Sequence, residues 1–164
     1  MIKSPLIEEL KAEWSQDSII TFLEARFGAV PPADDELVRA FLDGGPFVVT
    51  GPPRWNALGL DTTALFAAPL IYNTKRSGAF ELGRRRFVFR RVAFPRHPKP
   101  EWFVVDLFEN AASAGTSRAA LSEALTRALS RGAFDRVRLR HMANQFGVRE
   151  TRALIERALE RSAA

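Results

Sequence analysis

The sequence contains no cysteine, which excludes disulfide bonds, thiolate nucleophiles and cysteine-ligated zinc or iron–sulfur sites. It contains no apolar run near the roughly 20 residues that a membrane-spanning helix requires, and its first residues carry acids where a signal peptide would be apolar. Histidine is scarce, and neither His97 nor His141 has a second histidine three or four residues away, as a helical metal-binding motif would require. We expect a cytoplasmic protein with no cofactor, metal or membrane association.

Reactive groups of an enzyme are also scarce. No glycine-rich phosphate loop or serine nucleophile elbow occurs, and the prolines after Thr50-Gly51 lack the N–H donors that cradle a phosphate. Asp106 and Glu109 would share one helical turn and suit a metal ion or acid–base work. However, no nearby lysine completes the two-acid, one-lysine set of a metal nuclease. Acidic residues near the start of a helix are also explained by their favourable interaction with the helix dipole. We expect no enzymatic activity.

What the sequence does contain is apolar material for a folded core. Apolar residues make up 46% of the 164 residues, including 13 Phe. Residues 1–44 show helical spacing, with helices expected from Ser4, from about residue 17 to Gly28, and from 33 to 43. We treat this as an N-terminal helical segment, followed by an α+β domain over residues 45–164.

The period changes after residue 45. Short β-rich runs at 47–50, 70–74, 79–82 and 86–94 predict a meander, with turns at glycines. Residues 116–132, 135–147 and 149–161 predict three closing helices. The expected fold class is therefore α+β, with a small, mainly antiparallel sheet covered by N-terminal and C-terminal helices.

Positive charge is concentrated in the centre of the chain. The net charge is +5, but residues 75–99 hold nine basic residues against the single acid Glu81, interleaved with phenylalanines. If the arginines share one outward face of the sheet, they suit phosphate contacts; an acidic protein partner or a solvated sheet edge is the alternative. The candidates for phosphate contact are Lys75, Arg76, Arg84, Arg85, Arg86, Arg90 and Arg91.

Residues 139–152 resemble a helix-turn-helix, with Ala143 four residues before Gly147. The second helix would present three side chains to base edges from its first turn: Arg149, Thr151 and Arg152. The alternative is a helical hairpin that only packs.

A third pattern runs from Phe47 to Thr74. It joins a β run, Gly-Pro, Trp-Asn, Leu-Gly-Leu, a threonine pair and a strand ending Asn-Thr. Over residues 45–110 the chain resembles the AbiEi-type antitoxins of type IV toxin–antitoxin systems. The positions that carry the resemblance are Thr50, Gly51, Trp55, Asn56, Leu58, Gly59, Leu60 and Thr63.

The resemblance implies a transcriptional regulator that binds the DNA of its own operon. Such proteins counter a nucleotidyltransferase-like toxin without a stable complex, and they carry an N-terminal winged helix. The resemblance also implies scaffold roles: core positions for Trp55, Leu58 and Leu60, special backbone angles for the two glycines, and local hydrogen bonds for Asn56.

The N-terminal segment departs from that family pattern. Residues 1–43 carry nine acids and four bases, which makes a poor phosphate-facing surface. The competing hypothesis is a protein-interaction module of unknown partner, in which acidic helices and basic sheet contact other proteins or pair in a homodimer.

Overall fold

The structure, a computed structural model, describes residues 33–65 and 68–163. The two helices expected before residue 30 lie outside this range. The described contacts divide the chain into two compact units, one containing residues 33–49 and 68–93 and the other 50–65 and 94–163. These units do not coincide with the expected division at residue 44, because the helix before it packs on the strands that follow.

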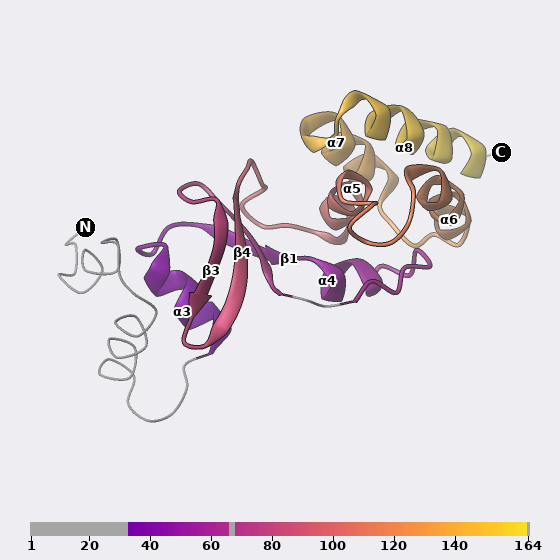
Figure 1. The fold of residues 1–164 in the computed structure, drawn as a ribbon. Coiled ribbons are helices and arrows are strands. Elements are labelled where there is room, and N and C mark those ends of the chain that lie inside the picture. The colour runs from indigo at the N-terminus through magenta and orange to yellow at the C-terminus, as the bar shows by residue number, and fades with distance from the viewer. Residues whose placement is uncertain (1–32, 66–67, 164) are drawn as a thin grey trace. The chain divides into compact units, whose positions relative to one another are not determined.

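The first unit is a four-stranded sheet with one described helix. The elements are α3 (Asp34–Phe41), β1 (Phe47–Thr50), β2 (Leu70–Asn73), β3 (Gly78–Leu82) and β4 (Arg85–Arg91). The sheet order is β1-β2-β4-β3, and α3 lies beside β3 and β4 (Figure 1). The predicted α+β class is confirmed.

The strand connections differ in part from the expected meander. β3 and β4 form the predicted antiparallel hairpin, with Phe80 opposite Phe87, but β2 pairs with β4 in parallel, with Ile71 opposite Phe89. Asn73 ends β2, where its side-chain oxygen accepts from the N–H groups of Lys75 and Arg76 at 2.8 and 2.7 Å. This turn carries the chain across the end of β4 before β3 begins.

The core of this unit is aromatic. Phe87 and Phe89 of β4 are buried against the apolar side of α3, where Leu37, Val38 and Phe41 recur at helical spacing. The Phe41 ring lies 5.0 Å from Phe80 and 5.1 Å from Phe89 between ring centroids. The face of β4 that carries these rings is therefore fixed toward α3.

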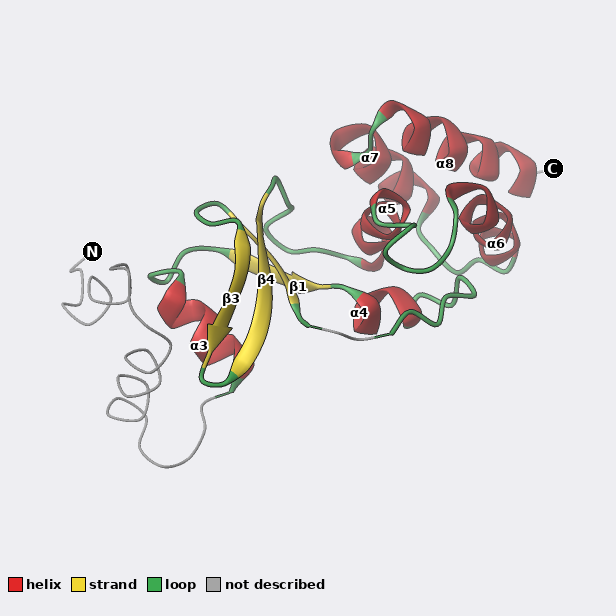
Figure 2. Cartoon of the chain, in the orientation of Figure 1, coloured by secondary structure: helices red, strands yellow, loops and turns green. Residues whose placement is uncertain are grey.

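The second unit is helical (Figure 2). It consists of α4 (Pro52–Asn56), α5 (Pro100–Glu109), α6 (Arg118–Ser130), α7 (Arg136–Phe146) and α8 (Arg149–Ser162). The three closing helices begin and end close to their predicted positions, with Ser117 and Asp135 as side-chain caps. Leu121, Leu125 and Leu129, expected on one face of α6, are all buried.

Gly147 makes the turn between α7 and α8 through close packing. Its φ of −81° suits any residue, but an added Cβ would lie 2.7 Å from the carbonyl oxygen of Ala143 and 3.3 Å from Cγ2 of Thr151. The glycine is therefore required because a Cβ would clash with a carbonyl of the last turn of α7 and press on the first turn of α8.

We predict that Gly147→Ala lowers the free energy of unfolding by about 1–3 kcal/mol, because the methyl group overpacks the turn. Urea denaturation monitored by circular dichroism measures the change. Val148→Ala, at a half-exposed neighbouring position, serves as the control. A loss in Gly147→Ala no larger than in this control would contradict the packing argument.

Candidate nucleic-acid interface

The arginines of β4 do not share one face of the sheet. Side chains alternate along a strand, so Arg85 and Arg91 lie on the same face as the buried rings, toward α3, whereas Arg86 and Arg90 lie on the opposite face. The expectation of a single outward cationic face is therefore wrong. The reason is the pattern itself, since adjacent basic residues in a strand always point to opposite faces.

Three of the candidate cations are engaged within the first unit. Arg85 forms an ion pair with Asp34 at the start of α3. The guanidinium of Arg76 lies 4.6 Å from the centroid of the Phe41 ring, a cation–π contact. The Nζ of Lys75 donates to the Leu42 carbonyl oxygen at 2.9 Å, just beyond the end of α3. These contacts hold the helix on the sheet.

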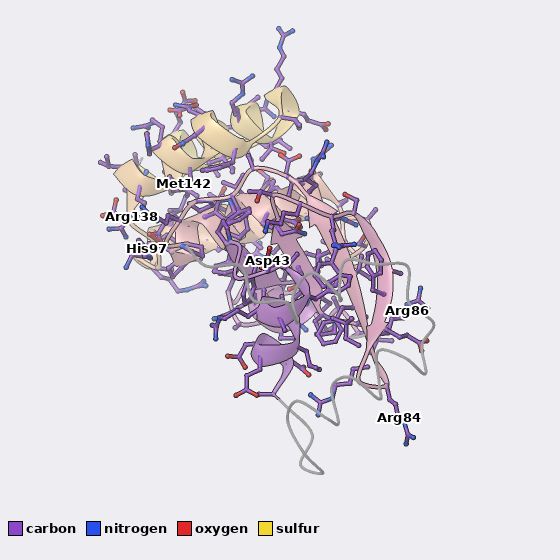
Figure 3. All side chains as sticks on the ribbon, turned by 90° about the vertical axis from the view of Figure 1, so that its left-hand side faces the viewer. Asp43, Arg84, Arg86, His97, Arg138 and Met142 are labelled. Atoms are coloured by element: carbon purple, nitrogen blue, oxygen red, sulfur yellow. The ribbon has the colours of Figure 1, made fainter. Side chains whose placement is uncertain are left out.

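Arg84 and Arg86 remain available at the hairpin turn. Both are exposed, and neither forms an ion pair or side-chain hydrogen bond within the described residues. Arg84 has a φ of 66° in the turn that joins β3 to β4, and Figure 3 shows it pointing away from the end of the hairpin. Arg86 lies opposite Glu81 and borders an open pocket of about 310 Å³.

The three candidate residues of α8 differ in solvent exposure. Arg149 and Arg152 are exposed and have no hydrogen-bond or ion-pair partner in the described chain. Thr151 is fully buried, and its hydroxyl has no hydrogen-bond partner. The prediction that Thr151 contacts a base edge is therefore wrong for this structure, because its side chain fills the space beneath the turn beside Gly147.

The turn between α7 and α8 is held by charged groups of α5 and α6. The N–H of Val148 donates to Oε1 of Glu109 at 2.9 Å. Arg118 pairs with Glu150 at 2.8 Å and approaches Glu109 at 3.8 Å. Glu109, considered from sequence as half of a reactive carboxylate pair, is thus engaged in positioning the turn.

Asp106, the other half of that pair, is buried in a separate hydrogen-bond network. Its Oδ2 accepts from the hydroxyl of Thr50 at 2.6 Å and from the indole N–H of Trp55 at 2.8 Å. Its Oδ1 accepts from the Asn110 amide at 3.1 Å. The carboxylate therefore ties the segment that begins α4 to α5.

Most scaffold roles implied by the resemblance agree with the structure. Trp55 and Leu60 are buried, and the two glycines have positive φ values of 109° and 73°. Asn56 exchanges two hydrogen bonds of 3.0 Å with the backbone of Ala64. Leu58 is only half-buried, which departs from its expected core position.

The structure contains an ion pair between α7 and α8 that was not predicted from the sequence. Arg140 donates to both carboxylate oxygens of Glu156, at 2.9 and 3.0 Å. These bonds hold the pKa of Glu156 below its ordinary value and raise the pKa of Arg140. The pair therefore stays charged at neutral pH and cancels one cation of α7.

No cluster of three or more potential metal ligands occurs within residues 33–65 and 68–163. None of the described helices is both long and apolar enough to cross a membrane. Comparison of the chain with protein-family models, curated proteins and solved structures gives no match. The described residues thus form an α+β arrangement in which several exposed cations have no partner among them.

We predict that Asp106→Ala lowers the free energy of unfolding by at least about 3 kcal/mol, because it leaves several buried donors without an acceptor. Urea denaturation measures the loss, and Glu123→Ala, at an exposed carboxylate paired with Arg161, provides the control. Equal effects in the two variants would show that the buried network contributes nothing special to stability.

We predict that the Arg140–Glu156 pair stabilises the fold only while Glu156 is ionised. Because the folded-state pKa is depressed, this stabilisation is complete above the unfolded-state pKa and is lost as the pH falls through the lower folded-state value. Wild type should therefore be more stable than Glu156→Gln at about pH 7, and the difference should vanish once the pH is below the folded-state pKa of Glu156. A difference that does not change between these conditions would refute the assignment.

Proposed function

We propose that this chain is a non-enzymatic, cytoplasmic DNA-binding protein. The observation that carries the proposal is the pair of exposed guanidinium groups at the β3–β4 hairpin, Arg84 and Arg86, which no acid in the described chain neutralises by an ion pair. Lys75, Arg76 and Arg85 are used within the fold, whereas Arg84 and Arg86, at the turn end of the hairpin, are left for a polyanion.

Guanidinium groups suit this role because they are permanently charged and donate paired hydrogen bonds to phosphate oxygens. Arg84 occupies the turn and Arg86 follows two residues later on β4, so both can meet a phosphate backbone that approaches the hairpin end. Such contacts read no sequence and depend strongly on salt. The hairpin is therefore proposed to supply affinity rather than specificity.

We further propose an antitoxin-like regulator that binds its own operon and counters a nucleotidyltransferase-like toxin without forming a stable complex with it. The support is the resemblance over residues 45–110, together with the agreement of Trp55, Asn56 and Leu60 with their scaffold roles. The test is to identify the gene beside this one and to express it alone and together with this chain. We expect it to encode a nucleotidyltransferase that arrests growth, and we expect co-expression of this chain to relieve the arrest. Absence of relief would contradict the antitoxin role.

We predict that the double variant Arg84→Ala/Arg86→Ala binds duplex DNA more weakly than wild type. Its dependence of log affinity on log salt should be shallower by roughly 2, since each phosphate contact contributes about 0.9 to the slope. Fluorescence anisotropy titrations of a labelled duplex, at several salt concentrations, measure both quantities.

Arg85→Ala is the matched control, because Arg85 lies between the two residues but is paired with Asp34. It should leave the salt slope close to that of wild type. The hairpin proposal fails if the control and the double variant lose affinity equally, or if the double variant binds as wild type does. Absence of DNA binding at low salt would favour the protein-interaction module.

A further inference from the structure

The corner where α7 turns into α8 brings together polar side chains that the fold does not use. Arg140 and Glu156 pair across the two helices and so mark the side on which α7 and α8 face each other. Asn144 follows Arg140 by four residues, and Arg152 precedes Glu156 by four, so each lies on the same side of its helix, one turn nearer the corner. Both side chains are exposed.

A contact at the turn locates the side chain of Arg152. Its Cγ lies 3.4 Å from where a Cβ on Gly147 would stand, so the stem of the side chain crosses the turn. Arg149 precedes Arg152 by three residues and is therefore its neighbour on the surface of α8. Neither arginine, nor Asn144, has a hydrogen-bond or ion-pair partner in the described chain. One amide and two guanidinium groups thus surround the corner.

We propose that this corner, formed by Asn144, Arg149 and Arg152, reads base edges in the major groove of duplex DNA. An asparagine amide pairs with the N6 and N7 of adenine, and an arginine pairs with the O6 and N7 of guanine. The major groove, about 12 Å wide, admits a helix. The inference rests on the proposed DNA-binding function and adds sequence readout to the sequence-blind contacts of the hairpin.

Duplex DNA is the favoured partner because of the kind of groups at the corner. An acidic protein surface would bind through Arg149 and Arg152 alone, and the exposed amide of Asn144 would have no function in such a complex. Single-stranded nucleic acid is bound mainly by stacking on aromatic rings, and none of the three corner residues is aromatic. Donor groups with fixed planar geometry instead match the edges of paired bases.

Glu156 limits the charge of the corner. Its carboxylate occupies the guanidinium of Arg140, one turn from both Asn144 and Arg152, and it places a negative charge where a phosphate backbone would approach. Glu156→Gln therefore frees a cation without touching the contact residues.

The experiment selects binding sites from a random duplex pool with the full-length chain, then measures affinity for the selected and scrambled duplexes. Wild type should prefer the selected duplex. Asn144→Ala and Arg152→Ala should each lose roughly 10- to 100-fold of that preference, the discrimination expected of a bidentate base contact. Arg152→Lys should lose preference while keeping affinity for scrambled DNA, because lysine retains charge but not the planar fork.

Arg131→Ala is the matched control, since Arg131 is exposed and unpartnered in the described chain but lies at the end of α6; it should keep the wild-type preference. Glu156→Gln should bind both duplexes more tightly than wild type. Thermal melting of each variant confirms that it is folded, as expected for substitutions of exposed side chains.

The outcomes separate this inference from the hairpin proposal. If wild type binds DNA but selects no sequence, or if Asn144→Ala and Arg152→Ala keep the full preference, the corner does not read bases and the hairpin proposal stands. Tighter binding to single-stranded RNA than to any duplex also overturns the inference. If wild type binds no duplex at low salt, the proposed function and the inference fail together.

Discussion

The burial of Phe87 and Phe89 against α3 is the constraint on which the first unit depends. Once these rings face the helix, alternation along β4 assigns every other side chain of the strand to a face. The arginine pairs at either end of the strand are thereby split, and Arg85 is brought to the acidic start of α3. Arg84, in the turn, and Arg86, on the face of β4 opposite the rings, stay exposed.

Much of the charge in this chain is used to hold elements together. Lys75 binds the carbonyl of Leu42 beyond the end of α3, Arg118 bridges α6 to the start of α8, and Arg138 of α7 pairs with the buried Glu101 of α5 at 2.7 Å. An ion pair between solvent-accessible groups, such as Arg118 with Glu150, contributes little to stability by itself, but all three contacts remove cations from the surface that a ligand would meet. The total of 24 Lys and Arg residues therefore overstates how many cations are available for binding.

Each compact unit retains its own small set of unpartnered polar groups. In the first they are two guanidinium groups at a hairpin, suited to phosphate. In the second they include an amide beside two guanidinium groups at a helix corner, which matches the chemistry of base edges. The division of labour proposed for them follows from these group types, with affinity from the hairpin and readout from the corner.

Sequence alone determined the α+β class and the boundaries of α6, α7 and α8, because caps, periodicity and turn residues act over a few positions. The positive φ values of Gly51 and Gly59 agree with what the resemblance implied. The sequence did not determine the parallel pairing of β2 with β4, the burial of Thr151 or the engagement of Asp106 by Thr50 and Trp55. Each of these depends on residues far apart in the chain. Only tertiary packing decides which donor reaches a carboxylate, and therefore which charges are left for a partner.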